Sequence, residues 1–303
     1  MELIRPDTRF DFIGKKKFTI WVSAIAILLS LGSIIYHGGL RYGVDFAGGI
    51  LLQIKFSKTV DISEVRNAME AIGSKEAMVQ KFGGENEFLI RVEKSSEDLE
   101  AMSGQIQTSL QERFKGQTPE IRRAEVVGPK VGKDLKEKAI WATGLSFLAI
   151  LVYVAFRFRQ FSYGLGGIAA LIHDIIITFG AISILDLEFS LPLLAVILTI
   201  IGFSINDTIV IFDRVRENIK KMRKEKIDTV FNVSINETLG RTILTSGTVM
   251  MVILILFFFG GPVIHDFTSA MIVGLISGTY STVYIASPVV LLWHSHITLK
   301  RKR

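Results

Sequence analysis

The chain has 303 residues, of which 49% are hydrophobic and 21% charged, with a net charge of +6 and a mean hydropathy of +0.42. This balance excludes an ordinary soluble globular protein and indicates an integral membrane protein whose charged residues lie in loops or in a soluble domain. Cysteine is absent, which excludes disulfides and thiolate chemistry, and the five histidines show no metal-ligand spacing. We therefore expect no metal and no cofactor.

Six apolar segments are long enough to cross a bilayer, because a helix of about 20 apolar residues spans the hydrocarbon core. We expect them at 18–36, 139–156, 163–185, 189–212, 242–260 and 267–293. Three lysines precede the first segment as they would in a signal peptide, but no A-x-A-like cleavage site follows it. We therefore interpret this segment as an uncleaved first transmembrane helix.

Basic residues are confined to one side of this predicted topology. They are Arg5, Arg9 and Lys15 to Lys17 before the first helix, Arg157 and Arg159 between the second and third, a basic segment at 213–239, and Lys300 to Arg303. The connections 186–188 and 261–266 contain neither Lys nor Arg. Because basic loops remain in the cytoplasm, both termini are predicted to be cytoplasmic. The positive charge is thereby assigned to orientation in the lipid bilayer, and no nucleic-acid partner is expected.

The segment 38–137 then lies outside the cytoplasm and has the pattern of a small folded domain. Strand-like runs at 49–56, 77–82, 87–93 and 120–127 alternate with helix-like runs at 61–73 and 96–114. This β-α-β-β-α-β order predicts a ferredoxin-like α+β domain within a polytopic α-helical membrane protein. The predicted domains are 1–37 with the first helix, 38–137 outside the cytoplasm, and 138–303 with helices 2–6, a cytoplasmic loop at 213–239 and a basic C-terminus.

The fourth predicted span contains a single ionisable residue, Asp207, within the run LPLLAVILTIIGFSINDTIVIF. A carboxylate in the bilayer costs about 2.5–3.5 kcal/mol, so such residues face a protein interior or a water path and are functional by default. Helical spacing places Ser204 and Thr208 on the same face, with Asn206 adjacent. The alternatives are a packing role, or a position close enough to the cytoplasmic end to be hydrated.

Polar residues also open the fifth predicted span, where Arg241 stands at the boundary. The fourth helix runs inward and the fifth returns, so Arg241 and Asp207 can lie at a similar depth. Burial favours the neutral acid and a nearby guanidinium favours the carboxylate, so this pair would link proton binding to conformation. The alternative for Arg241 is a flanking cation whose guanidinium reaches the lipid headgroups.

Six polar side chains near Asp207 are candidates for a proton path: Ser204, Asn206, Thr208, Thr245, Ser246 and Thr248. Each hydroxyl has a simpler alternative role, which is to bond the backbone of its own helix or a neighbour. His173 and Asp174 form a second polar pair within the third span. For that pair, a relay element and a satisfied structural pair are both open interpretations.

Ala270, Gly274 and Gly278 recur every four residues in the last span, a spacing that lets helices pack closely. The run GPKVGKDL at 128–135 resembles a phosphate-binding loop. It is one residue short between its glycines, and it has Asp134 where a Ser or Thr would bind magnesium. We reject a nucleotide site there, so energy for transport must come from an ion gradient or a partner.

Several long motifs stand out together in the chain: GFSINDTIVIFDRVREN (202–218), NETLGRTILTSGTVM (236–250) and FTSAMIVGLISGTYSTVYIASP (267–288), with GVDFAGG (43–49) and VVGPKVGKDL (126–135) before them. Together they resemble the SecF family, the smaller subunits of the SecDF protein-export complex. They occur in order from the first helix to the end of the chain. Family members are similar to one half of a resistance-nodulation-division transporter, with six helices and an extracytoplasmic domain between the first two.

The resemblance implies a non-enzymatic auxiliary subunit of the Sec protein translocase in the cell (inner) membrane. With SecD, it would use the proton-motive force to promote preprotein translocation. The implied partners are SecD, the SecYEG translocon and SecA-dependent preproteins, with YidC and YajC as further ones. The intramembrane acid of the family falls on Asp207, and its essential basic residue falls on Arg241. Many relatives are fused SecD–SecF chains, whereas this sequence begins with its own Met1, so assembly with SecD is expected either between chains or between separated halves of one chain.

Two other functions stay open on the sequence alone. The chain could be a non-conducting assembly subunit that braces SecD and the translocon, in which case neutralising Asp207 and Arg241 would leave export intact. It could also be a half-size exporter of lipids or drugs, which shares the architecture. The specific motifs weigh against the exporter.

Overall fold

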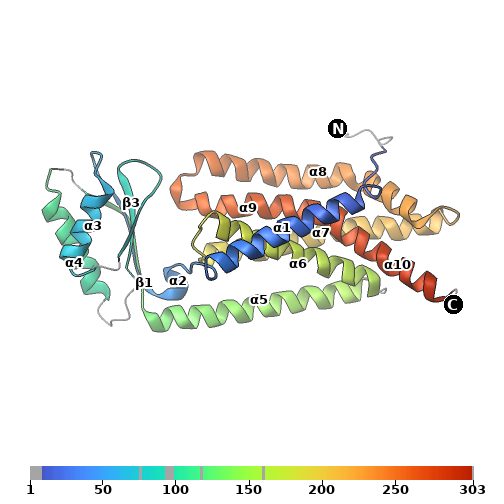
Figure 1. Ribbon diagram of the computed structural model, residues 1–303, viewed down its shortest axis with the longest axis horizontal. Coiled ribbons are helices and arrows are strands. Elements are labelled where there is room, and N and C mark those ends of the chain that lie inside the picture. The colour runs from blue at the N-terminus through green and yellow to red at the C-terminus, as the bar shows by residue number, and fades with distance from the viewer. Residues whose placement is uncertain (1–8, 75–76, 93–98, 117–118, 159–160, 302–303) are drawn as a thin grey trace. The chain divides into compact units, whose positions relative to one another are not determined.

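The computed structural model describes residues 9–74, 77–92, 99–116, 119–158 and 161–301 (Figure 1). The chain divides into two compact units. The sheet unit comprises Tyr42–Ala142 with Glu188–Leu191, and the helical unit comprises Met1–Arg41, Thr143–Leu187 and Pro192–Arg303. The short segment 188–191 therefore belongs with residues far from it in the sequence.

The sheet unit has the predicted β-α-β-β-α-β order. Its elements are α2 (Val44–Ala47), β1 (Gly49–Lys55), α3 (Ile62–Ala71), β2 (Met78–Lys81), β3 (Glu87–Val92), α4 (Leu99–Arg113) and β4 (Glu120–Val127). The strands are arranged β2-β3-β1-β4, and every neighbouring pair is antiparallel. This confirms the ferredoxin-like prediction. Only α2 was not predicted, because four residues are too few to show a helical period.

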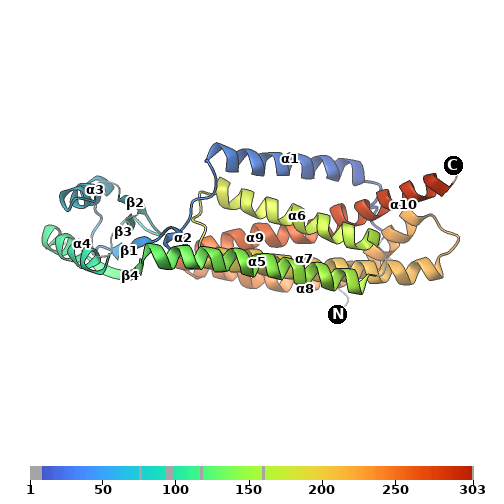
Figure 2. The ribbon, with the colours of Figure 1, turned by 90° about the horizontal axis from the view of Figure 1, so that it is seen from below.

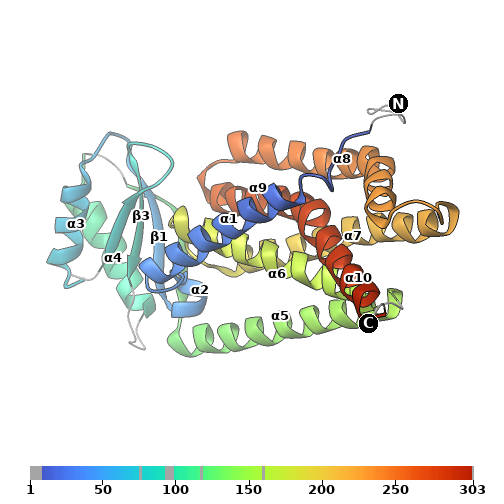
Figure 3. The same cartoon turned by 45° about the vertical axis from the view of Figure 1, so that its right-hand side comes forward.

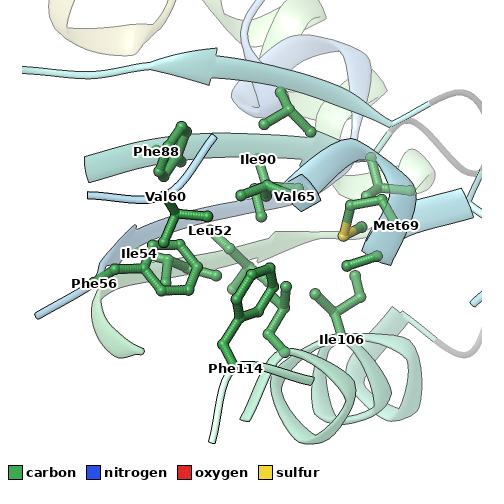
Figure 4. Close-up of a cluster of buried hydrophobic side chains, with 14 of the residues drawn as sticks. Leu52, Ile54, Phe56, Val60, Val65, Met69, Phe88, Ile90, Ile106 and Phe114 are labelled. Carbon is green, nitrogen blue, oxygen red and sulfur yellow. The ribbon is translucent and has the colours of Figure 1, made fainter. Parts of the chain in front are cut away.

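The core of the sheet unit is formed by apolar side chains between the sheet and the two longer helices (Figure 4). Leu52 and Ile54 of β1 and Ile90 of β3 are almost completely buried, with Val65 of α3 and Ile106 of α4 packed against the same cluster. At the start of α3, the side chain of Asp61 accepts hydrogen bonds from the hydroxyl and backbone N–H of Ser63. The hydroxyl bond, followed by the backbone bond, lowers the pKa of that carboxyl.

A second set of contacts in the sheet unit holds the segment 188–191. The backbone N–H of Gly43 donates to the carbonyl of Phe189 at 2.8 Å, and the Phe46 and Phe189 rings stack with centroids 5.6 Å apart. Asp45 accepts a hydrogen bond from the N–H of Leu191 at 2.9 Å. Leu191 is the first residue of α7, so the GVDF run directly caps that helix.

Among the residues that the structure describes, six helices are long and apolar enough to cross a membrane, as predicted. They are α1 (Lys16–Tyr36), α5 (Pro129–Arg157), α6 (Phe161–Ile184), α7 (Leu191–Lys221), α8 (Ile227–Phe259) and a last span made of consecutive helices. That last span consists of α9 (Pro262–Ser281), the π-turn η1 (Thr282–Ala286) and α10 (Ser287–Arg301). In Figure 3, α10 continues in a different direction from α9. The chain is a multi-pass membrane protein.

The six spans differ in how much of their surface is covered by protein. In α6, α7 and the last span, 50%, 50% and 61% of the most apolar window is buried, against 17% in α1, 6% in α5 and 11% in α8. Helix α6, helix α7 and the last span therefore form the interior of the unit. Helix α1 packs on α6 (Figure 2) and α8 packs on α9 (Figure 1). Polar residues buried in α6, α7 and α9 are thus shielded from lipid.

The segment 213–239 was expected to be a loop, but most of it is helical. Helix α7 continues to Lys221 and α8 begins at Ile227, so only residues 222–226 connect them. Polar contacts stabilise these extensions: Arg214 pairs with Glu237 at 2.8 Å, and Asn218 donates to the same carboxylate at 2.7 Å. Charged residues that pair between two helices give no apolar periodicity along either helix. The apolar pattern in the sequence is therefore shorter than the helices themselves.

Candidate functional site

Asp207 lies in the interior of the helical unit, where α7, α8 and α9 meet. Its side chain is 3% exposed. The hydroxyl of Ser246 in α8 donates to Oδ2 of Asp207 at 3.5 Å, at the outer limit of a hydrogen bond. Thr279 of α9 donates in turn to the Ser246 hydroxyl oxygen at 3.1 Å. Among the residues that the structure describes, Ser246 is the only hydrogen-bond donor to this carboxylate.

Arg241 is not brought into contact with Asp207. It lies five residues before Ser246 on α8, with an exposed side chain. Within the described part of the chain, no ion pair joins it to Asp207 or to another carboxylate. The two residues lie on helices that share the same polar junction, and their coupling stays a prediction.

The other predicted path residues fall into two groups. Ser204 and Thr208 are buried on α7, and Thr208 donates to the Ser204 carbonyl at 3.1 Å. Asn206 and Thr248 are exposed. Thr245 and Thr248 bond the backbone of their own helix, to the carbonyls of Arg241 and Thr245. Ser246 alone among the six bonds Asp207.

A second buried carboxylate lies at Asp174 on α6, with no exposed surface. Ser204 of α7 donates to Oδ2 at 2.6 Å, and Ser281 of α9 donates to the same oxygen at 2.7 Å. Ser277 of α9 donates to Oδ1 at 2.7 Å. The Nδ1 atom of His173 lies 3.1 Å from Oδ1. Three helices are therefore joined through one carboxyl group.

Sequence analysis singled out Asp174 and Ser204 separately, and missed Ser277 and Ser281. A signal was present, because these two serines are four residues apart and therefore lie on one face of the last span. Their partner could not be found without knowing that α6 packs against α9. The assignment of Ser204 to the Asp207 path rested on spacing within α7, whereas its hydroxyl donates to Asp174.

Small residues permit the close packing of these helices. A Cβ atom on Gly278 would lie 3.2 Å from Cβ of Ser204, and one on Gly274 would overlap Ile200. Both glycines of α9 thus lie against α7, and Ala270 is fully buried on the same helix. A larger side chain at Gly278 would separate α9 from Ser204 and so from the Asp174 cluster.

No three His, Asp or Glu side chains gather as a metal site among the residues that the structure describes. The chemistry available at the junction is therefore that of carboxyl groups, hydroxyls and one imidazole. These groups bind, donate and accept protons.

The sequence matches two family models. Residues 105–296 match the model described as protein export membrane protein SecD/SecF, C-terminal, and residues 34–60 match the SecD/SecF GG motif. The second match includes the segment that caps α7.

Curated relatives are similar over nearly their whole length. The chain is 42% identical over 283 residues to the protein translocase subunit SecF of Endomicrobium trichonymphae, which covers 93% of this chain and 91% of that one. It is 41% identical over 298 residues to the SecF subunit of Thermodesulfovibrio yellowstonii, covering 97% and 98%.

Solved structures of SecDF are also similar. The crystal structure of the translocon-associated SecDF from Thermus thermophilus matches with a TM-score of 0.85 and 35% identity, over 97% of this chain. A SecDF crystal structure described as a super-membrane-facing form matches with a TM-score of 0.72 and 35% identity. This chain spans about 40% of the length of these SecDF chains.

Proposed function

This chain belongs to the SecF family of protein translocase subunits, and from that premise we propose that it works with SecD to couple the proton-motive force to preprotein translocation. Asp207 is the proton carrier in this proposal. The observation that carries it is a nearly fully buried carboxyl group in a membrane-spanning helix, with a single hydrogen-bond donor among the described residues, at 3.5 Å. Such a group gains little from being ionised where it stands.

The local hydroxyls allow both protonation states of Asp207. When the carboxyl group is ionised, the Ser246 hydroxyl donates to it; when it is protonated, the acid donates and the serine oxygen accepts. Thr279 donates to Ser246 in the present arrangement, so α9 responds to the state of the pair. Arg241 supplies the opposite charge when a movement of α8 brings it inward, and this favours release of the proton.

The segment 188–191 offers a mechanical route from the sheet unit to Asp207. Asp45 caps α7 at Leu191, and Arg91 forms a buried ion pair with Glu188 at 3.2 Å. Asp207 lies 16 residues further along the same helix, which is about 24 Å at the rise of an α-helix. A force on the sheet unit would therefore reach the N-terminus of the helix that carries the proton.

The topology that this function requires follows the predicted domain boundaries. We place both termini and the 222–226 connection in the cytoplasm, and 38–137 on the outer side of the cell (inner) membrane. That side is where an emerging preprotein is available to the sheet unit. SecD, the SecYEG translocon and SecA-dependent preproteins are the proposed partners, with YidC and YajC as further components of the assembly.

The test is export driven by the proton-motive force in inverted membrane vesicles that contain this chain and SecD. We expect Asp207→Asn to reduce the proton-dependent part of preprotein translocation at least about tenfold, because an amide cannot carry the proton. Asp213→Asn is the matched control, since Asp213 lies on the same helix and pairs with Arg157. It should retain export.

Normal proton-dependent export by Asp207→Asn, with insertion and SecD binding intact, would exclude Asp207 as the carrier. If the double variant with Arg241→Gln also exports normally, the chain is a non-conducting brace for SecD and the translocon. Substrate-dependent efflux of an apolar compound from the same vesicles would instead support an exporter.

A further inference from the structure

The Asp174 carboxylate has all of its acceptor positions filled. Each oxygen of a carboxylate has two lone pairs, so the group accepts about four hydrogen bonds. Ser204 and Ser281 occupy Oδ2, while Ser277 and Nδ1 of His173 occupy Oδ1. Three of these donors come from other helices. Hydrogen bonds from donors to a carboxylate are stronger than those to a neutral acid, so this arrangement is suited to a negative charge.

The position of Asp174 makes that charge costly. It lies 13 residues from the beginning of α6 and 10 from its end, near the middle of the span, and none of its surface is exposed. An unpaired carboxylate at the middle of a bilayer is costly even on the mildest insertion scale. The cost falls when an opposite charge in contact makes the cluster neutral.

His173 is the group that can supply that charge. Its side chain is buried, and its Nδ1 donates to Oδ1 when the carboxyl group is ionised, because an ionised carboxylate only accepts. Among the described residues, it is the only basic side chain paired with Asp174. From α9, the Tyr280 ring stacks on the imidazole with centroids 6.0 Å apart, and its hydroxyl donates to the Thr19 carbonyl of α1. On α7, the acid Asp207 follows Ser204 by three residues.

We propose that His173 and Asp174 form a second intramembrane proton-binding site, held by the hydroxyls of Ser204, Ser277 and Ser281. The bound proton lies on Nδ1 of His173, so the pair consists of an imidazolium and a carboxylate and has no net charge. A metal ion would need oxygen lone pairs, and those of the carboxylate are taken by the four donors.

The His173–Asp174 site and the surroundings of Asp207 both include residues of α7 and α9. Ser204 is three residues before Asp207 on α7, and Thr279 lies between Ser277 and Ser281 on α9. Thr279 donates to Ser246, which donates to Asp207. A change in the hydrogen bonds of Asp174 therefore shifts the groups around Asp207. The pair is a positioning site for the carrier, and this coupling rests on the proposed function.

The test is the charge state of His173 by 15N NMR, using the full chain with labelled histidine in phospholipid bilayers. Five histidines give signals, and His173→Gln assigns the one of interest. We expect an imidazolium signal from His173 at about pH 7. In Asp174→Asn, the imidazolium fraction should fall about tenfold or more, because an opposite charge in contact has been removed. The signal of exposed His37 should not change.

Serine variants keep the test informative if Asp174→Asn does not insert. Ser277→Ala removes a donor to Oδ1 and should lower the imidazolium fraction of His173 by a smaller factor. Ser269→Ala is the control on the same helix, since within the described part of the chain this hydroxyl bonds the His265 carbonyl alone, and it should change nothing. A neutral His173 in the wild type, or an imidazolium fraction unaffected by both Asp174→Asn and Ser277→Ala, would overturn the proposal.

The experiment needs neither SecD nor export. A failure of Asp207→Asn to affect translocation would leave the His173 result standing, and a neutral His173 would leave Asp207 as the proposed carrier. The two proposals can therefore fail separately.

Discussion

The two buried carboxyl groups of the helical unit have similar exposure and opposite hydrogen bonding. Asp174 accepts three hydroxyl bonds of 2.6–2.7 Å and lies 3.1 Å from an imidazole nitrogen. Asp207 accepts one hydroxyl bond of 3.5 Å. Burial alone therefore does not determine what an intramembrane acid does. The number of donors around it decides whether its charge is held or exchanged.

The exposed acid Asp61 shows the same principle outside the membrane. A single serine donates its hydroxyl and its backbone N–H to this carboxyl, and its pKa falls below the ordinary value. Asp174 receives hydroxyls from two neighbouring helices, so its hydrogen bonds also join those helices. An acid with this environment is suited to structure and positioning, and an acid with few donors is suited to carrying a proton.

The largest expected effect on stability is that of Asp174→Ala. Removing this carboxyl leaves three buried hydroxyls and an imidazole without their acceptor, which costs about 3–5 kcal/mol in comparable buried ion pairs. Asp207→Ala breaks one weak bond and should cost about 1 kcal/mol. Thermal unfolding of the chain in detergent should show a larger fall in Tm for the first variant.

The control for these two variants is Asn206→Ala, an exposed position beside Asp207 that should change the stability by less than about 0.5 kcal/mol. Equal losses of stability in Asp174→Ala and Asp207→Ala would contradict this prediction, because the two carboxyl groups would then contribute equally to the stability of the fold.

A smaller difference is expected between two serine variants. Ser281→Ala removes a hydroxyl that donates to Asp174 at 2.7 Å, and hydrogen bonds to charged groups contribute about 1.5–3 kcal/mol. Ser246→Ala removes the 3.5 Å bond to Asp207 and should cost less than about 1 kcal/mol. The ranking should reverse for proton-dependent export, which Ser246→Ala should lower more. Thermal unfolding and proton-dependent export, measured on the same preparation of each variant, check this ranking. A Ser281→Ala variant as stable as the wild type would contradict it.

The sequence predicted much of the architecture because each element has its own periodic signal. The six spans were identified from hydropathy, and the ferredoxin-like domain from alternating strands and two short helices. The helical extensions at 213–239 were missed because their stability comes from pairs such as Arg214 with Glu237. Such pairs form between helices and leave no pattern along one of them.

The site was predicted less completely than the fold. Asp207 stands out in the sequence because it is the single ionisable residue of an apolar run. The energetic cost of a charge in the bilayer is enough to indicate a function. The Asp174 cluster depends on Ser204, Ser277 and Ser281, which lie 30 to 107 residues from it along the chain. Only the packing of α6 against α7 and α9 brings them together. Serines within one helix most often bond their own backbone, so no local rule assigns them to a distant carboxylate.

Infrared difference spectroscopy of the full chain in lipid tests the contrast most directly. The measurement follows the C=O stretching band of protonated carboxyl groups as the pH is raised. We expect Asp207→Asn to remove a titrating band that is present in the wild type, and Asp174→Asn to leave this band in place. A titrating band that disappears in Asp174→Asn and persists in Asp207→Asn would contradict it, because Asp174 would then be the acid that exchanges its proton.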